Sequence, residues 1–475
     1  MPFEFSNVMQ VQQALRLGTY TCRQVVQHYL SVIGNKKHLN AFLEVFVDDA
    51  LQQADATDAK LKNSKPVGKL FGCVIAVKDV ICMKGKKVTA SSKILENFTS
   101  LYNATVIERL LAEDAILIGR TNCDEFAMGS SNENSAFGNV LNDADNSKVP
   151  GGSSGGSAVA VQAGMCMVSL GTDTGGSIRQ PASFTGTVGF KPTYGRVSRY
   201  GVIAYASSFD QVGTFSKSAQ DAALIMEVIA GQDEHDATTS SKPIQLSLSN
   251  IKPATPLRFA YYSQALDHPK LDPEIRSSIY QTIEKLKGDG HIVEPQDLNY
   301  LDSLIPTYYV LTTAEASSNL SRYAGIHYGY RDMKAENLET VIRSSRSKGF
   351  GREVQRRIML GTFVLSSGYY DAYYTHAQKV RRIIRQETEN ILKNYDYILL
   401  PTTPSTAFGI GEVKDPIEMY LADIFTVQAN IVGAPAISVP LYRHSNGLPF
   451  GLQIIGKRYS EGDLLTVTQY LQGFY

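Results

Sequence analysis

The chain has 475 residues, of which 43% are hydrophobic and 19% charged, a composition typical of a globular protein. Lysine plus arginine equals aspartate plus glutamate at 46 each, so there is no basic field that could bind nucleic acid unaided. Because the five cysteines are scattered, the N-terminus lacks a signal-peptide pattern and no apolar run is long enough to span a membrane, we expect a cytoplasmic protein with reduced thiols.

The first part of the chain predicts helices that alternate with short apolar strands. Thr21 and Gln24 form a capping box at the start of a helix with an apolar stripe up to Ile33. A further helix is predicted over residues 48–61, and another begins after Asn103, which is placed to cap it. Buried strands are predicted over residues 74–77 and 115–118. This alternation predicts a largely parallel sheet covered by helices.

The second part predicts the same kinds of element after a linker at residues 238–256, which are rich in Ser, Thr, Lys and Pro. A strand is predicted to begin at residue 257. Helices are predicted over residues 221–231, 272–288, 308–323 and 352–387, and strands over 291–293, 397–400, 431–440 and 450–456. The aromatic stripe of the longest helix (Tyr369, Tyr370, Tyr373 and Tyr374) is predicted to lie in the core. Length alone suggests two or three domains.

Two glycine-serine turns lie close together in the middle of the sequence. Residues 151–157 read Gly-Gly-Ser-Ser-Gly-Gly-Ser, residues 158–170 form an apolar run predicted to be one buried element, and Thr174-Gly175-Gly176-Ser177 repeats the pattern. A flexible linker would not lead directly into an apolar run, and a P-loop would need a lysine that neither turn contains. Such turns can aim backbone N–H groups at a developing oxyanion, while serine can act as a nucleophile when a base activates it.

The base for these serines is predicted to be Lys78. No histidine occurs between His38 and His235, so a Ser-His-Asp triad would need a distant partner. Lys78 ends a buried strand, and burial lowers the pKa of a lysine because the charged form loses hydration. The alternative is that Lys78 reaches solvent or pairs with Asp79. We assign Ser177 as nucleophile, with oxyanion donors from Thr174, Gly175, Gly176 and Ser177, and Ser153 as a bridge to neutral Lys78.

Residues 151–181 resemble the motif of the amidase signature family, and the resemblance covers essentially the whole chain. It implies an α/β fold with a large mixed central β-sheet covered by helices on both faces. It also implies a Ser-cisSer-Lys triad of Ser177, Ser153 and Lys78, with a cis peptide bond before Ser153. The length-based estimate is then replaced by one amidase domain over residues 1–475: an N-terminal helical layer (1–65), the signature core (66–230) and a remainder with substrate-pocket helices (231–475).

Further stretches resemble the glutamine-hydrolysing subunits of tRNA-dependent amidotransferases, a group within that family. They are residues 121–131, 191–201, 357–363, 371–374 and 422–424. The resemblance implies that Arg357 binds the α-carboxylate of glutamine and Asp423 its α-amine. Tyr308 or Tyr309, together with Met128, Gly129 and Ser130, would line the pocket. A zwitterion needs one fixed cation and one fixed anion, although taken singly Arg357 and Asp423 would more often be surface charges.

The same resemblance implies partners. A B subunit would receive ammonia from glutamine and, with ATP and Mg²⁺, convert Glu-tRNA(Gln) to Gln-tRNA(Gln), making most of the tRNA contacts, and a small C subunit would complete the complex. No cofactor, metal ion or membrane is expected for the glutamine-hydrolysing chain itself. The alternatives are a stand-alone amidase acting on another small amide and a catalytically inactive scaffold subunit.

Overall fold

The computed structural model describes residues 5–244, 246 and 256–474, and within them eleven strands form one mixed sheet. The strand order is β1-β3-β2-β4-β6-β5-β10-β11-β9-β7-β8. The strands are β1 (Phe42–Val45), β2 (Val74–Lys78), β3 (Ile116–Thr121), β4 (Val168–Asp173), β5 (Val188–Lys191), β6 (Gln211–Ser216), β7 (Arg258–Tyr262), β8 (Ile292–Gln296), β9 (Tyr397–Pro401), β10 (Ala436–Arg443) and β11 (Pro449–Gly456).

The sheet is parallel in two places and antiparallel elsewhere. Strand β2 runs parallel to β3 and β4, and β7 runs parallel to β8 and β9. The strands between these groups, from β6 to β11, pair antiparallel. A largely parallel sheet, expected from the alternation of strands and helices, is therefore wrong for the centre of the fold, and the mixed sheet implied by the family resemblance is confirmed.

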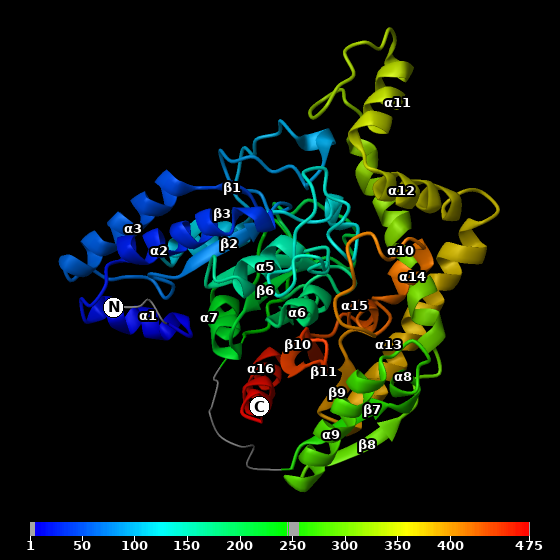
Figure 1. Ribbon diagram of the computed structural model, residues 1–475. Helices are drawn as coiled ribbons and strands as arrows, with labels where there is room; N and C mark the ends of the chain where they lie inside the picture. Colours follow the sequence, from blue (N-terminus) through cyan, green and yellow to red (C-terminus); the bar gives the residue numbers. More distant parts are fainter. Residues whose placement is uncertain (1–4, 245, 247–255, 475) are drawn as a thin grey trace.

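Helices cover both faces of this sheet (Figure 1). The helices are α1 (Val8–Arg16), α2 (Cys22–Asn35), α3 (Val47–Lys62), α4 (Thr105–Ala112), α5 (Gly155–Gln162), α6 (Arg179–Thr185), α7 (Ala219–Ile229), α8 (Ser263–Leu266), α9 (Pro273–Gly288), α10 (Leu304–Asn319), α11 (Leu338–Gly349), α12 (Arg352–Val364), α13 (His376–Asn394), α14 (Pro416–Leu421), α15 (Val427–Val432) and α16 (Glu461–Gln472). None of those in the described ranges is long and apolar enough to cross a membrane.

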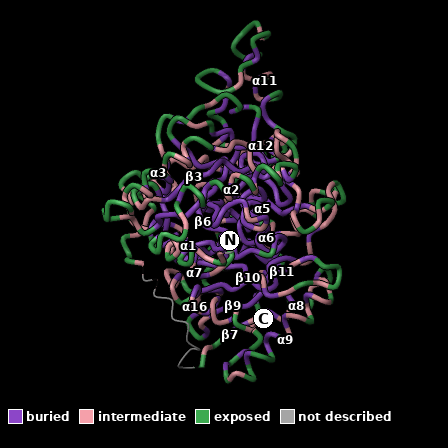
Figure 2. The backbone as a smooth tube through the Cα atoms, turned by 60° about the vertical axis from the view of Figure 1, so that its left-hand side comes forward, coloured by how far each residue is buried: buried purple, intermediate pink, exposed green. Residues whose placement is uncertain are grey.

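Helices α5 and α6 pack on the middle of the sheet, and the buried residues concentrate there (Figure 2). Every residue from Gly155 to Val161 is buried, so α5 has no polar face, as expected for a helix enclosed on all sides. Strand β2 is also buried throughout, which explains its continuous apolar sequence between two parallel neighbours. The two glycine-serine turns flank α5 and β4, and so lie in the most enclosed part of the fold.

Several sequence predictions of local structure are wrong. Residues 158–170 are not one element: Gly164, with φ of 70°, separates the end of α5 from β4, a break that an apolar run does not reveal. Asn103 does not cap α4; its side chain accepts a hydrogen bond from the backbone of Lys84 (2.7 Å), and Ala104 precedes the helix. Helix α1 and strand β1 are additions that the sequence pattern does not predict.

The helix predicted over residues 352–387 is also interrupted. Helix α12 ends at Val364, Gly368 has φ of 90°, and a π-helical turn, η6 (Tyr370–Thr375), leads into α13. The aromatic stripe predicted to be core is largely exposed, with Tyr369, Tyr370 and Tyr373 at 44%, 45% and 43% exposure. These rings therefore lie largely at the surface. In the predicted linker at 238–256, residues 245 and 247–255 lie outside the described residues.

Candidate active site

Lys78 is fully buried at the end of β2, where the ends of two parallel strands meet. Its Nζ lies 2.8 Å from Ser153 Oγ, 2.8 Å from Ser154 Oγ and 2.9 Å from Thr172 Oγ1. Thr172 belongs to β4, the parallel neighbour of β2, and the carboxyl ends of such strands share one edge of a sheet. Asp79 instead holds Arg120, with its Oδ1 2.6 Å from Nη1, so Lys78 neither reaches solvent nor pairs with Asp79.

The burial of Lys78 increases the fraction of its amine that is neutral. Burial lowers the pKa of Lys78 to about 8, against the opposing effect of nearby acidic groups that include Asp124 and Asp210. Ser154 donates its own hydrogen to the carbonyl of Thr172 (3.1 Å), so it can only accept from the amine. The hydroxyls of Ser153 and Thr172 remain able to donate to the lone pair of a neutral lysine.

The backbone around Ser153 is held tightly. The Gly152–Ser153 peptide bond is cis, as the family resemblance implied. Gln180 accepts from the Gly152 N–H (3.0 Å), and the Asp124 N–H donates to the Ser153 carbonyl (3.0 Å). A Cβ at Gly152 would lie 2.0 Å from Asp124 Oδ2, so only glycine fits there. Burial raises the pKa of Asp124 to about 6. Sequence analysis missed this carboxylate, although it lies in the loop before the serine turns.

Ser177 lies between the end of β4 and the start of α6 and is the most exposed of the three predicted catalytic residues, at 8%. In the described ranges its hydroxyl makes no hydrogen bond to Ser153 or Lys78. Catalytic hydrogen bonds in unliganded sites are often long and tighten only when substrate binds. The path of the chain nonetheless places Ser177 five residues beyond Thr172, which Lys78 contacts directly.

The second turn has the form of an oxyanion site. Thr174 is fixed by a hydrogen bond from its hydroxyl to Asp210 (2.6 Å), and Thr426 donates to the Gly175 carbonyl (2.7 Å). Of the four predicted donors, Gly176 already donates its backbone N–H to Asp173 Oδ1 (2.8 Å). The backbone N–H groups of Thr174, Gly175 and Ser177 have no acceptor among the described residues. Such uncommitted N–H groups could bind the oxygen of a tetrahedral intermediate.

A buried ion pair that sequence analysis missed supports this turn. Arg179 binds Asp173 with two hydrogen bonds of 3.0 Å, from Nε to Oδ2 and from Nη2 to Oδ1, and both side chains are fully buried. Its other N–H groups reach Thr426, Asn430 and Gln453. Burial raises the pKa of Asp173, but the charge and hydrogen bonds of Arg179 outweigh it and hold the pKa at about 2. The signal was present in the motif, where Arg179 stands two residues after the Gly-Gly-Ser turn.

Arg357 and Asp423, predicted to read the two charges of a substrate, are both buried and are not surface charges. Arg357 on α12 is 3% exposed, and Asp423 between α14 and α15 is 7% exposed. Burial raises the pKa of Asp423 to about 7, while a hydrogen bond from Ser130 (2.6 Å) and the charge of Arg357 lower it. A cation and an anion are thus enclosed within electrostatic range of each other.

The remaining predicted pocket residues have different neighbours. The ring of Tyr308 contacts Gly175, where a Cβ would lie 2.5 Å from Tyr308 Cζ. Tyr309 lies over the Arg357 guanidinium, with 5.2 Å between ring centre and Cζ. Met128 is fully buried, and Gly129 packs so closely on Asp124 that a side chain there would clash. Both tyrosines therefore border the site, Tyr308 at the turn and Tyr309 at the cation.

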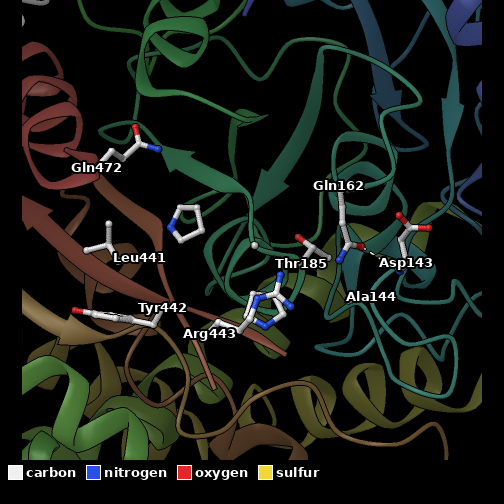
Figure 3. A pocket seen from close by; sticks show the side chains of 11 residues that line it. Asp143, Ala144, Gln162, Thr185, Leu441, Tyr442, Arg443 and Gln472 are labelled. Atoms are coloured by element: carbon white, nitrogen blue, oxygen red, sulfur yellow. Dashed lines mark hydrogen bonds between the residues drawn. The ribbon is translucent and has the colours of Figure 1, made fainter. Parts of the chain in front are cut away.

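A separate hollow of about 530 Å³ opens elsewhere on the molecule (Figure 3). It is lined by residues from the ends of α5 and α6, from β10 and from α16, including Gln162, Thr185, Tyr442 and Gln472. None of its lining residues belongs to the lysine-serine cluster or to the charge pair. Among the described residues, no group of three or more His, Cys, Asp or Glu side chains is placed to hold a metal ion.

The chain is similar to known amidases over nearly its whole length. The sequence profile of the amidase family matches residues 24–465. The A subunit of glutamyl-tRNA(Gln) amidotransferase from Chlorobium luteolum is 49% identical over 478 residues, which cover 99% of this chain and 97% of the relative. The crystal structure of the corresponding A subunit from Thermotoga maritima is 41% identical, with a TM-score of 0.77, covering 94% of this chain and 90% of that one. A crystal structure of an amidase is 28% identical, with a TM-score of 0.83, covering 98% and 99%.

The mixed α/β fold of this chain is that of solved amidase structures. With the profile matching most of the sequence and relatives near half identity, the chain belongs to the amidase family.

Proposed function

We propose that this chain is the glutamine-hydrolysing A subunit of a cytoplasmic, tRNA-dependent amidotransferase. The observation that carries the proposal is the fully buried Lys78, with its Nζ 2.8 Å from Ser153, beside a glycine-rich turn with uncommitted N–H groups. The enclosed charges of Arg357 and Asp423 suit the α-carboxylate and α-ammonium of glutamine. The relatives near half identity carry the name of the A subunit of glutamyl-tRNA(Gln) amidotransferase.

In the first half of the reaction, Ser177 Oγ attacks the side-chain amide carbon of glutamine. Its proton passes through the Ser153 hydroxyl to neutral Lys78, while the backbone N–H groups of the second turn stabilise the oxyanion. Lys78 then returns the proton, again through Ser153, to the amide nitrogen. The C–N bond breaks, ammonia leaves, and a γ-glutamyl ester remains on Ser177.

In the second half, water attacks the ester and gives a proton to the same relay. The ester C–O bond breaks, the proton returns to Ser177 Oγ, and glutamate is released. Ammonia passes to a B subunit, which uses ATP and Mg²⁺ to convert Glu-tRNA(Gln) to Gln-tRNA(Gln) and makes most of the tRNA contacts. A small C subunit completes the heterotrimer. This chain uses no cofactor of its own in the scheme.

The test is Ser177→Ala in the co-expressed complex, with amidation of Glu-tRNA(Gln) measured with glutamine and, separately, with ammonium chloride as nitrogen donor. We expect glutamine-dependent amidation to fall at least about a thousandfold, because the nucleophile is lost, and ammonium-dependent amidation to persist. Ser347→Ala, an exposed serine on α11, is the matched control.

Each alternative gives a different result. Unimpaired glutamine-dependent amidation in Ser177→Ala would show an inactive scaffold subunit. Rapid hydrolysis of simple aliphatic or aryl amides by this chain alone, with no B or C subunit captured on co-expression, would show a stand-alone amidase.

A further inference from the structure

Glu353 is a nearly buried carboxylate beside the predicted substrate cation, and no role in the reaction has been assigned to it. It lies in the first turn of α12, four residues before Arg357, with its side chain 10% exposed. Its Oε1 accepts a hydrogen bond from Arg357 Nε at 2.9 Å. Burial raises the pKa of Glu353, but the adjacent Arg357 outweighs this and keeps it below its usual value, so the carboxylate is charged.

The same oxygen of Glu353 has a second partner from another part of the chain. Tyr420 Oη donates to Glu353 Oε1 at 3.0 Å. Tyr420 is on α14, and Asp423 follows it three residues later. A single carboxylate oxygen therefore joins the helix that carries the substrate cation to the segment that carries the substrate anion.

Glu353 also determines which edge of Arg357 is open. Arg357 Nε donates to Glu353, and Arg357 Nη1 donates to Tyr205 Oη (3.0 Å). The Tyr205 hydroxyl donates in turn to Thr312 Oγ1 (3.0 Å). The rings of Tyr205, Tyr309 and Tyr420 surround the guanidinium, with 5.5, 5.2 and 5.6 Å between ring centres and Cζ. Because Nε and one Nη1 hydrogen are engaged, a carboxylate is directed toward Nη2, which makes no hydrogen bond among the described residues.

We propose that Glu353 is a positioning residue that sets the spacing between Arg357 and Asp423 and thereby the selectivity of the site for α-amino acid amides. The inference rests on the proposed function and deepens it. An α-amino acid carries its ammonium and carboxylate on one carbon, so the separation of the cation and anion that bind them must be held closely. Without the Glu353–Tyr420 connection, α12 and α14 can shift relative to each other, and the two charges no longer bind both groups at once.

The experiment measures ammonia release by the assembled amidotransferase from glutamine and from glutaramate, which has the same amide and carboxylate but no α-amino group. For Glu353→Gln we expect KM for glutamine to rise about tenfold to a hundredfold, the range for a lost hydrogen bond to a charged group, with kcat within about threefold. The preference for glutamine over glutaramate in kcat/KM should fall by a similar factor. Tyr420→Phe breaks only the link to the Asp423 segment, so it should raise KM for glutamine and leave KM for glutaramate near wild type.

Glu339→Gln is the matched control. It breaks an exposed pair with Arg343 of the same spacing and orientation, on the neighbouring helix α11, and should leave both KM values unchanged. A wild-type KM and preference in a folded Glu353→Gln complex would overturn the inference. If that variant does not fold, an unchanged preference in Tyr420→Phe overturns it instead. If the wild-type complex releases no ammonia from glutamine, the proposed function fails, and the role of Glu353 fails with it.

Discussion

The proposed proton relay makes a quantitative prediction about pH. The pKa of Lys78 falls from an ordinary value of 10.5 to about 8 because the amine is fully buried. At pH 7 about one lysine in ten is then neutral, compared with about one in three thousand at the ordinary value, a gain of roughly three-hundredfold in the reactive form. The free energy that burial sets against the charged form is about 3 kcal/mol.

The sign of the effect follows from the role of the amine. Only neutral Lys78 can accept a proton, so kcat should rise about tenfold per pH unit below the pKa and level off above about pH 8. Glutamine must be saturating, because Asp423, with its pKa of about 7, also titrates and must be ionised to hold an ammonium. At lower pH its protonation should raise KM and leave kcat unaffected.

The assay is initial ammonia release by the assembled complex between pH 6 and pH 9, for wild type and for Lys78→Met. The methionine variant should lose at least about a thousandfold in kcat, and its residual rate should lack the rise with pH. A thermal unfolding curve checks that the variant is folded. A wild-type kcat that is flat across this range, or that still rises steeply at pH 9, would refute the assignment of Lys78 as the base, as would a methionine variant that keeps the pH dependence.

Two further predictions concern the second turn. Gly175→Ala should lower kcat/KM about a hundredfold, because the new Cβ would lie 2.5 Å from the Tyr308 ring and displace an oxyanion donor. Asp173→Asn should destabilise the protein by about 3–5 kcal/mol in urea unfolding, because it leaves the buried Arg179 guanidinium without its carboxylate.

Each of these substitutions has a control elsewhere in the chain. Gly34→Ala adds a methyl group where no atom lies within 4 Å, near the end of α2, and should leave ammonia release unchanged. Glu389→Gln breaks the exposed pair with Arg385 and should change the unfolding free energy by no more than about 0.5 kcal/mol. Wild-type kinetics in Gly175→Ala, or a loss of less than about 1 kcal/mol in Asp173→Asn, would contradict the reasoning.

Most of the secondary structure could be predicted from local pattern. The capping box of Thr21 and Gln24 starts α2, and the short β-branched run before Lys78 forms β2. These are short-range effects, set by capping hydrogen bonds and by runs of consecutive apolar residues. The same local reasoning failed where the chain breaks. Gly164 separates α5 from β4 within one apolar run, and Gly368 interrupts the helix predicted over 352–387 just before its aromatic stripe.

The candidate residues were likewise visible in the sequence, but their environment was not. The absence of histidine near the serine turns pointed to Lys78, and the motif pointed to Ser153 and Ser177. Whether Lys78 was a buried base or a solvated surface charge depended on the pairing of β2 with β4, which brings Thr172 and the first turn to the amine. Burial is a property of the whole packed molecule, so the lowered pKa of that lysine could not be predicted from its neighbours in the chain.

Other long-range partners were beyond sequence analysis. Arg179 meets residues some 250 positions away, and Tyr420 reaches Glu353 across 67 positions. The residue types that the proposed reaction requires can thus be identified from the sequence, because reactivity is a property of individual side chains. Which of them are charged, enclosed and in reach of one another is decided only when distant segments pack together, because desolvation and hydrogen bonding depend on every group around a site and not on the order of residues.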